Sequence, residues 1–80
     1  RTPHIHYKVF AKGCEDLTTQ MYFSPNSFSD KAEQQIVDDL NRKDRVLNRL
    51  TSQEQKQVIV DFQRSGNDLK GVFDITLKRL

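Results

Sequence analysis

Eighty residues hold at most one domain, since single domains run from about 50 to 250 residues. Apolar residues make up 35% of the chain and charged residues 30%, with a mean hydropathy of −0.76. Ordinary globular domains have an apolar share of ~45–50%, so we expect a small core here. Leu, Ile, Val and Phe still total 22 of 80, which keeps disorder from being the default interpretation. We expect no membrane span, no retained signal peptide and, with Cys14 alone, no internal disulfide.

Charge argues against a nucleic-acid partner. Thirteen Lys and Arg against eleven Asp and Glu give a net charge of +2, with the signs interspersed. The one basic cluster, Arg42, Lys43 and Arg45, is interrupted by Asp44. A nucleic-acid-binding protein normally gathers its positive charge on one face.

The chain begins at Arg1 rather than methionine and continues directly into Thr2-Pro3-His4. We therefore expect the 80 residues to belong to something longer: a fragment, a processed product or a truncated sequence.

Two strands are expected first. Residues 4–11 (HIHYKVFA) are rich in β-branched and aromatic types and contain no Gly or Pro, and residues 17–23 (LTTQMYF) repeat the pattern. Residues 13–16 are short enough for a hairpin connection, so the two strands are expected to be neighbours. Alternation places His4 and His6 on one face of the first strand.

A loop at residues 24–27 leads to a helical segment. Ser29 or Asp30 can cap a helix over residues 30–40, where apolar residues recur at helical spacing, and Glu33 lies three residues after Asp30 as in a capping box. A second short helical turn is expected near residues 46–50. Residues 51–56 are polar and are expected to form a loop.

Two more strands are expected at residues 58–63 (VIVDFQ) and 72–77 (VFDITL), separated by a turn over residues 64–68. Four strands and one helical insertion predict a mostly β chain, namely a portion of a β-sandwich with a short helical insertion. The strands need a partner sheet that these 80 residues do not fully supply.

His4 and His6 are the first candidates for chemistry. Residues two apart on a strand point the same way, with Cα atoms about 6.6–6.8 Å apart. Two imidazoles at that spacing can converge on one metal at about 2.1 Å, and imidazole suits Zn, Cu, Fe and Ni. A polar strand face is the simpler interpretation of the same pattern. Cys14, Asp61 and Asp74 are expected to be incidental rather than ligands.

A longer motif surrounds this pair. The segment Arg1-Thr2-Pro3-His4-Ile5-His6-Tyr7 is followed by Gly13 and then by Leu17-Thr18-Thr19-Gln20-Met21-Tyr22-Phe23. This order resembles the C-terminal catalytic region of the intradiol ring-cleavage dioxygenases (the protocatechuate 3,4-dioxygenase and catechol 1,2-dioxygenase family), which has an Arg-x-x-His-Ile-His-aromatic strand, a glycine turn and Leu-Thr-Thr-Gln on the next strand. Residues 73–77 (FDITL) resemble the closing strand of the protocatechuate 3,4-dioxygenase side of the family. The likeness is close over residues 1–23 and loose over residues 58–77.

The resemblance implies a mononuclear non-haem Fe(III) site in a β-sandwich, held by two His and two Tyr with a hydroxide or water as the fifth ligand. His4 and His6 match the two His, Arg1 matches the active-site arginine, and Gln20 matches the glutamine near it. The implied reaction opens a catechol-type ring between its hydroxyl-bearing carbons with O2 and gives a cis,cis-muconate. Residues 1–80 would then be the C-terminal part of one catalytic domain. The family is mostly cytoplasmic, with some exported members, and the oligomeric state stays open.

The two tyrosine ligands of the family come from upstream of this motif. Tyr7 and Tyr22 are the only tyrosines here, and neither matches a ligand position. Tyr7 alternates away from His4 and His6 and is expected to be core, and Tyr22 is expected to pack in the core or the sheet. The isolated 80 residues are therefore expected to be inactive.

Two rival interpretations stay open. The chain can be a non-catalytic β-sandwich interaction module that lacks iron, or a Zn- or Cu-binding strand pair of unrelated origin. Arg1 and the Leu-Thr-Thr-Gln match argue against the second rival, although Arg1 can also simply pair with a surface carboxylate. Two upstream tyrosines and a burgundy tyrosinate–Fe(III) colour would separate the enzyme from the module.

Overall fold

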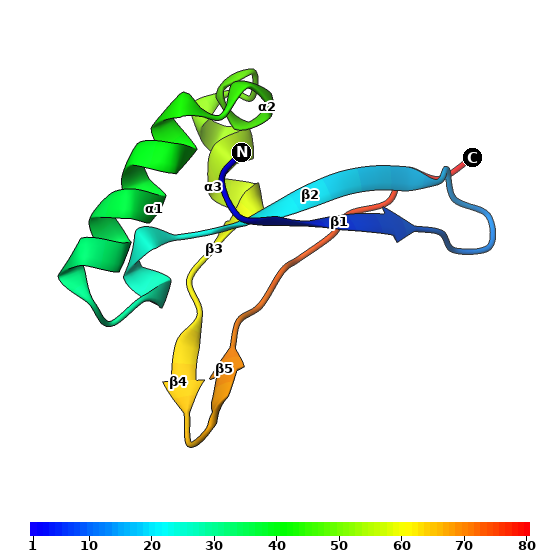
Figure 1. Ribbon diagram of the computed structural model, residues 1–80. Helices are drawn as coiled ribbons and strands as arrows, with labels where there is room; N and C mark the ends of the chain where they lie inside the picture. The colour runs from blue at the N-terminus through cyan, green and yellow to red at the C-terminus, as the bar shows by residue number, and fades with distance from the viewer.

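The computed structural model describes residues 1–80 as two small β-sheets and three α-helices (Figure 1). The strands are β1 (His4–Val9), β2 (Leu17–Phe23), β3 (Ile59–Val60), β4 (Gln63–Ser65) and β5 (Asp68–Lys70), and the helices are α1 (Lys31–Lys43), α2 (Arg45–Asn48) and α3 (Ser52–Val58), with a 3-10 helix η1 at Pro25–Ser27. About 34% of the chain is helical and about 29% is strand. The chain is therefore mixed α/β, and the expected mostly β composition is not confirmed.

The hairpin of β1 and β2 forms as its alternating pattern predicts. The two strands are antiparallel, with His4 opposite Tyr22 and His6 opposite Gln20. Directly opposed residues share a face of the sheet, so these four side chains lie together on one side. Gly13 occupies the connecting loop with φ +81°, a conformation that L side chains rarely adopt.

Of the two predicted caps for the first helix, Ser29 and Asp30, Asp30 is the one that forms. The Asp30 side chain accepts a hydrogen bond from the Ala32 N–H at 2.8 Å, and α1 continues three residues past the predicted end, to Lys43. Asp44 then caps α2 through the N–H of Leu47 at 3.0 Å, which confirms the second short helical turn.

The loop predicted over residues 51–56 is wrong, because α3 covers most of it. Thr51 accepts a hydrogen bond from the Glu54 N–H at 3.2 Å, and the Glu54 carboxylate accepts one from the Thr51 N–H at 2.9 Å. This capping box satisfies two donors that the start of a helix otherwise leaves free, so a polar segment becomes helical.

The strand predicted at residues 58–63 is wrong in extent, and the strand predicted at residues 72–77 does not form. Of residues 58–63, only β3 pairs along a sheet, running parallel to the end of β2, and β4 begins at Gln63. The turn predicted over residues 64–68 is the tip of the β4–β5 hairpin, with Gly66 at φ +63°. Residues 72–77 form an extended segment (Figure 1) that belongs to no sheet and makes no backbone hydrogen bond.

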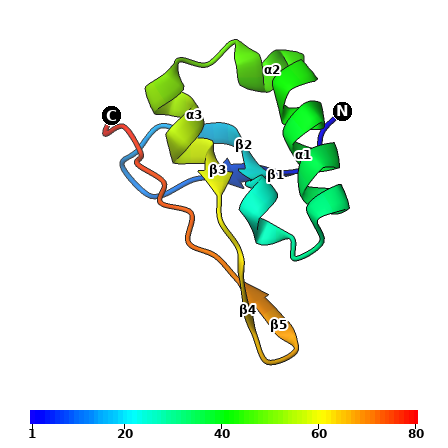
Figure 2. The same ribbon diagram turned by 90° about the vertical axis from the view of Figure 1, so that its left-hand side faces the viewer.

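The molecule is open rather than compact. Nine of 80 residues are buried, and the radius of gyration is 14.1 Å, against about 12 Å for a compact domain of this length. Figures 1 and 2 show the helices gathered at one end of the β1–β2 hairpin while β4–β5 projects away from it. The apolar core is the junction between the helices and β2 and β3, made of Met21, Tyr22, Val37, Leu47 and Val60. None of the helices has the length and apolar character that crossing a membrane requires.

Candidate functional site

His4 and His6 project from the same face of β1, as their spacing predicts. Their Nε2 atoms lie 3.1 Å apart, and the two rings meet edge to face with centroids separated by 4.8 Å. The spacing along the strand thus places the Nε2 atoms of His4 and His6 side by side on one face of the sheet.

The hydrogen bond partners of His4 determine which of its ring nitrogens carries the proton and which one lies next to His6. Its Nδ1 lies 2.7 Å from the carbonyl oxygen of Thr2, an atom that can only accept, so Nδ1 carries the proton and Nε2 keeps a lone pair. The Thr2 side chain is buried and donates to the amide oxygen of Asn41 on α1, which holds the carbonyl in place. Metal-ligating histidines typically donate their second nitrogen in this way.

The pair fits two adjacent ligands of one metal ion. Two nitrogens bound at about 2.1 Å and at a right angle would lie about 3.0 Å apart, close to the 3.1 Å observed between the Nε2 atoms of His4 and His6. The chain contains no cluster of three or more His, Cys, Asp and Glu side chains that could hold a metal. Within the chain, no third side chain of these types joins the two imidazoles.

Arg1 lies beside the imidazoles and binds a buried carboxylate. Its Nε and Nη2 donate to the two carboxylate oxygens of Asp44, each at 3.1 Å. Nη2 also lies 2.8 Å from the amide oxygen of Gln20 and 3.2 Å from the hydroxyl of Tyr22, and Nη1 lies 3.4 Å from Nε2 of His4. The guanidinium thus joins the first residue, β2 and the start of α2 at the edge of the histidine pair.

The charges in this cluster stabilise one another. Burial raises the pKa of the Asp44 carboxyl, but hydrogen bonds from Arg1 and from the N–H of Leu47 outweigh burial and lower the pKa from 3.8 to about 2. The hydrogen bond to Asp44 raises the pKa of Arg1. Burial and the charge of Asp44 raise the pKa of Tyr22 against the opposing effect of Arg1. Tyr22 therefore keeps its proton and donates it to Gln20 at 2.8 Å.

The structure brings together all four residues singled out in the sequence: Arg1, His4, His6 and Gln20. The other candidates stay apart from them. Cys14 forms an isolated backbone bridge with Arg79 near the hairpin turn, and Asp61 and Asp74 are exposed.

Asp44 was missed as part of the site because it lies 43 residues from Arg1 in the chain. The sequence did contain one indication of a special role for Asp44: it is an acidic residue inside a basic cluster, at the start of a helix. The surface carboxylate considered as a partner for Arg1 is in fact a buried one. Tyr22 is buried as expected, and its hydroxyl also joins the cluster, which its shared face with Gln20 could have indicated.

Comparisons of the chain with protein-family models, with curated proteins and with solved structures return no match. The resemblance to the intradiol dioxygenases therefore depends on the sequence alone, closely over residues 1–23 and loosely over residues 58–77.

Proposed function

We propose that the chain supplies the two histidine ligands and the arginine and glutamine of an intradiol ring-cleavage dioxygenase site. Its substrate would be a catechol-type aromatic together with O2, and its metal a mononuclear non-haem Fe(III). Under this proposal residues 1–80 are the C-terminal part of a β-sandwich catalytic domain, and two tyrosine ligands come from outside them.

One observation carries the proposal: His4 and His6 aim two nitrogens at one point, 3.1 Å apart, while Nδ1 of His4 is occupied by a backbone carbonyl. Without a metal, the same 3.1 Å contact is a hydrogen bond between the two rings, so the proposal also depends on the positions of Arg1 and Gln20 beside them. Arg1 lies beside the His4 ring and donates to Gln20, and both residues occur in the chain in the order that the family motif gives them.

Fe(III) would supply Lewis acidity that favours a deprotonated catechol and its reaction with O2. Arg1 would hold a permanent positive charge beside the bound ring and stabilise negative charge as it develops on the oxygens. Asp44 keeps the guanidinium in place through two hydrogen bonds, so that little reorganisation is needed during the reaction. Gln20 accepts from both Arg1 and Tyr22, which orients its amide.

Replacement of the histidines tests the ligand role. His4→Ala or His6→Ala, made in the intact protein that contains this sequence, removes one of about four protein ligands and is expected to lower both iron content and catechol turnover. Iron is measured by mass spectrometry, the tyrosinate–Fe(III) colour by visible absorption and turnover by O2 uptake. Lys8→Ala is the matched control, since Lys8 lies on the same strand face and is exposed. Full iron and full ring cleavage in His4→Ala would contradict the proposal.

Arg1→Ala is expected to behave differently. Iron and colour should persist, while kcat falls roughly 10²–10³-fold, the usual cost of losing one preorganised charge-stabilising contact. An interaction module without iron would instead show neither colour nor turnover in the unaltered protein. A colourless zinc site with no tyrosine around the metal would also overturn the proposal.

A further inference from the structure

Thr2 is a buried residue between two residues of the proposed site, Arg1 and His4. It is 1% exposed and has no partner in the sheet, because β1 begins at His4. The next residue, Pro3, has a fixed φ and restricts the backbone of Thr2 to extended conformations. The Thr2 carbonyl therefore has a defined direction relative to His4, and the position of this first segment depends on the contacts that hold Thr2.

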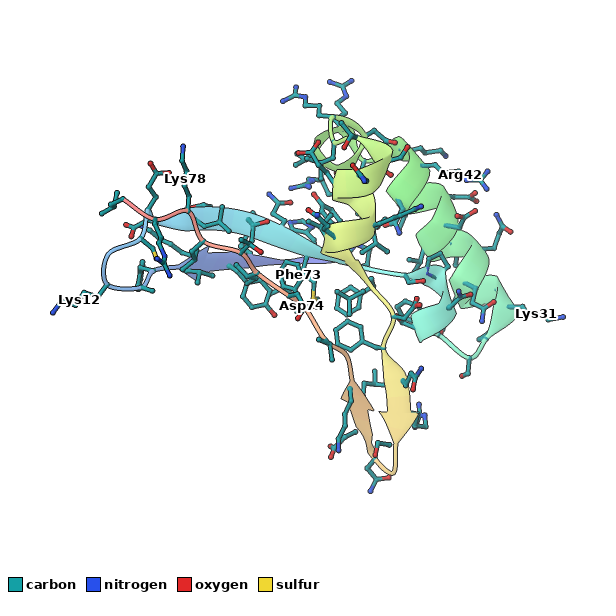
Figure 3. All side chains as sticks on the ribbon, turned by 180° about the vertical axis from the view of Figure 1, so that it is seen from behind. Lys12, Lys31, Arg42, Phe73, Asp74 and Lys78 are labelled. Carbon is teal, nitrogen blue, oxygen red and sulfur yellow. The ribbon has the colours of Figure 1, made fainter.

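The hydroxyl of Thr2 binds the side chain of Asn41, which lies in the last turn of α1. Thr2 Oγ1 donates to Oδ1 of Asn41, a residue 39 positions away in the chain. Nδ2 of Asn41 donates at 3.0 Å to the carbonyl oxygen of Phe23, the last residue of β2. Asn41 is 8% exposed, whereas Figure 3 shows its neighbour Arg42 on the side of α1 that faces away from the β1–β2 hairpin. Asn41 thus joins the first segment of the chain to the end of β2.

The direction of each hydrogen bond in this series is determined. A carbonyl oxygen can only accept, so the Asn41 amide turns its NH2 group to Phe23 and its oxygen to Thr2. The Thr2 hydroxyl must then donate. The Thr2 carbonyl also can only accept, so His4 donates to it from Nδ1 at 2.7 Å and keeps the lone pair on Nε2. The series therefore runs in one direction, from the end of β2 through α1 to the His4 ring.

We propose that Asn41 and Thr2 are positioning residues for His4, an inference that rests on the proposed function. Asn41 sets the position of Thr2, and the Thr2 carbonyl holds the His4 ring in the tautomer that directs the Nε2 lone pair at the metal. Buried partners behind a ligating histidine fix its tautomer and ring orientation in this way. Helix α1 thereby contributes to the metal site, although none of its residues is a ligand.

The same corner between α1 and α2 holds Arg1 through a separate contact. Asp44, three residues after Asn41, accepts hydrogen bonds from the Arg1 guanidinium. The Asn48 side chain joins the two positions, because it donates to the carbonyls of Asn41 at 3.0 Å and of Asp44 at 2.7 Å. One side chain of the corner thus binds the residue that orients the imidazole, and another binds the guanidinium. Loss of the first contact should affect the metal, and loss of the second should affect the reaction.

Thr2→Val tests the proposal in the intact protein that contains this sequence. Valine has nearly the shape of threonine but no hydroxyl, so the bond to Asn41 is lost while the backbone carbonyl remains. Loss of such a partner behind a ligating histidine typically costs about 10- to 100-fold in metal affinity. We expect a decrease of that size in iron affinity, measured by competition with a chelator, while kcat per bound iron stays close to that of the unaltered protein. This result is the reverse of the one expected for Arg1→Ala.

A second measurement does not depend on iron. At about pH 8.5, above the ordinary histidine pKa of about 6.5, the ring of His4 is neutral, and 15N NMR of the metal-free protein shows which ring nitrogen carries the proton. His4 should have its proton on Nδ1 in the unaltered protein. Thr2→Val should show a mixture of the two tautomers, because the carbonyl that selects one of them is no longer held in place.

Two further variants separate positioning from stability. Thr2→Ser keeps the hydroxyl and should preserve both the iron affinity and the single tautomer of His4. Ser27→Ala is the matched control, because the Ser27 hydroxyl also joins distant segments: it donates to the Val60 carbonyl at 3.2 Å and accepts from the Phe62 N–H at 2.8 Å. Ser27→Ala should lower stability in urea and leave His4 and iron affinity unchanged.

The proposal is overturned if Thr2→Val keeps both the iron affinity and the single tautomer, or if Thr2→Ser or Ser27→Ala is impaired as much as Thr2→Val. A proton on Nε2 of His4 in the unaltered, metal-free protein overturns it without any variant, and this measurement applies even where Thr2→Val does not fold. Absence of iron and of ring cleavage in the unaltered protein would contradict the proposed dioxygenase instead. The tautomer change in metal-free Thr2→Val would then still support the positioning of His4 by Thr2 and Asn41.

Discussion

At the scale of single residues, Arg1 is the centre of the cluster. It contacts the Asp44 carboxylate, the Gln20 amide, the Tyr22 hydroxyl and the His4 ring, which come from the start of α2, from β2 and from β1. A guanidinium offers five donors in a rigid fork, so one side chain can hold several acceptors in fixed positions. The orientation of the proposed site therefore depends on the Arg1–Asp44 pair more than on any other contact.

Asp44→Asn should destabilise the fold in a pH-dependent way. The folded pKa of Asp44, about 2, lies below its ordinary 3.8, so the carboxylate contributes about 2 kcal/mol of stability that is fully present above pH 3.8. That contribution is lost as the pH falls through about 2. Urea unfolding of the intact protein that contains this sequence should therefore separate the variant from the unaltered protein at pH 7 and bring the two together at pH 2.

The matched control for this experiment is Asp38→Asn. Asp38 pairs with Arg42 at 2.9 Å on the exposed surface of α1, where an ion pair is worth little. Its effect at pH 7 should stay below about 0.5 kcal/mol. Equal destabilisation by the two variants would show that Asp44 holds no special position.

At the scale of elements, α3 depends on its cap. It has seven residues, none of them buried, so packing contributes little to it. The reciprocal hydrogen bonds between Thr51 and Glu54 stabilise the start of the helix instead. Because α3 leads directly into β3, the cap also influences whether the sheet gains its third strand.

Thr51→Ala should therefore reduce both helix content and stability. Loss of an N-cap typically costs about 1 kcal/mol. Urea unfolding of the intact protein that contains this sequence, followed by circular dichroism, measures it. Ser52→Ala changes the neighbouring hydroxyl, which makes no side-chain hydrogen bond, and should have little effect. A Thr51→Ala variant as stable as Ser52→Ala would mean that α3 is held by something other than its cap.

At the scale of the whole molecule, the shape has consequences for stability. Few residues are buried, Ile5 and Phe10 are exposed on the hairpin, and Val72 and Leu80 are exposed on the C-terminal segment. A chain that buries so little apolar surface has little to offset the conformational entropy of folding. The open edges of β2 and of residues 72–77 are the places where further burial can be gained.

We expect the isolated chain to unfold over a broad range at low temperature, without a sharp transition. Circular dichroism and calorimetry measure this directly, and calorimetric and van't Hoff enthalpies should disagree. A cooperative two-state melt at high temperature in the free chain would contradict this expectation.

The sequence by itself predicted those features that depend on neighbouring residues only. Alternation and a glycine turn predict the β1–β2 hairpin, and the shared face of His4 and His6 follows from the strand period of two. Asp30 marks the start of α1 through its own side chain. The capping pattern from Thr51 to Glu54 was also readable, and the polar composition between them hid it.

Other features depend on partners distant in the chain, and only the tertiary structure decided them. Asp44 joins Arg1 because α2 begins beside β1, and no spacing rule connects residues that far apart. Residues 72–77 have strand composition but no strand, because a strand exists only where a neighbour accepts and donates its hydrogen bonds. Composition determines which segments can form a strand, and the tertiary structure determines whether a partner strand lies next to them.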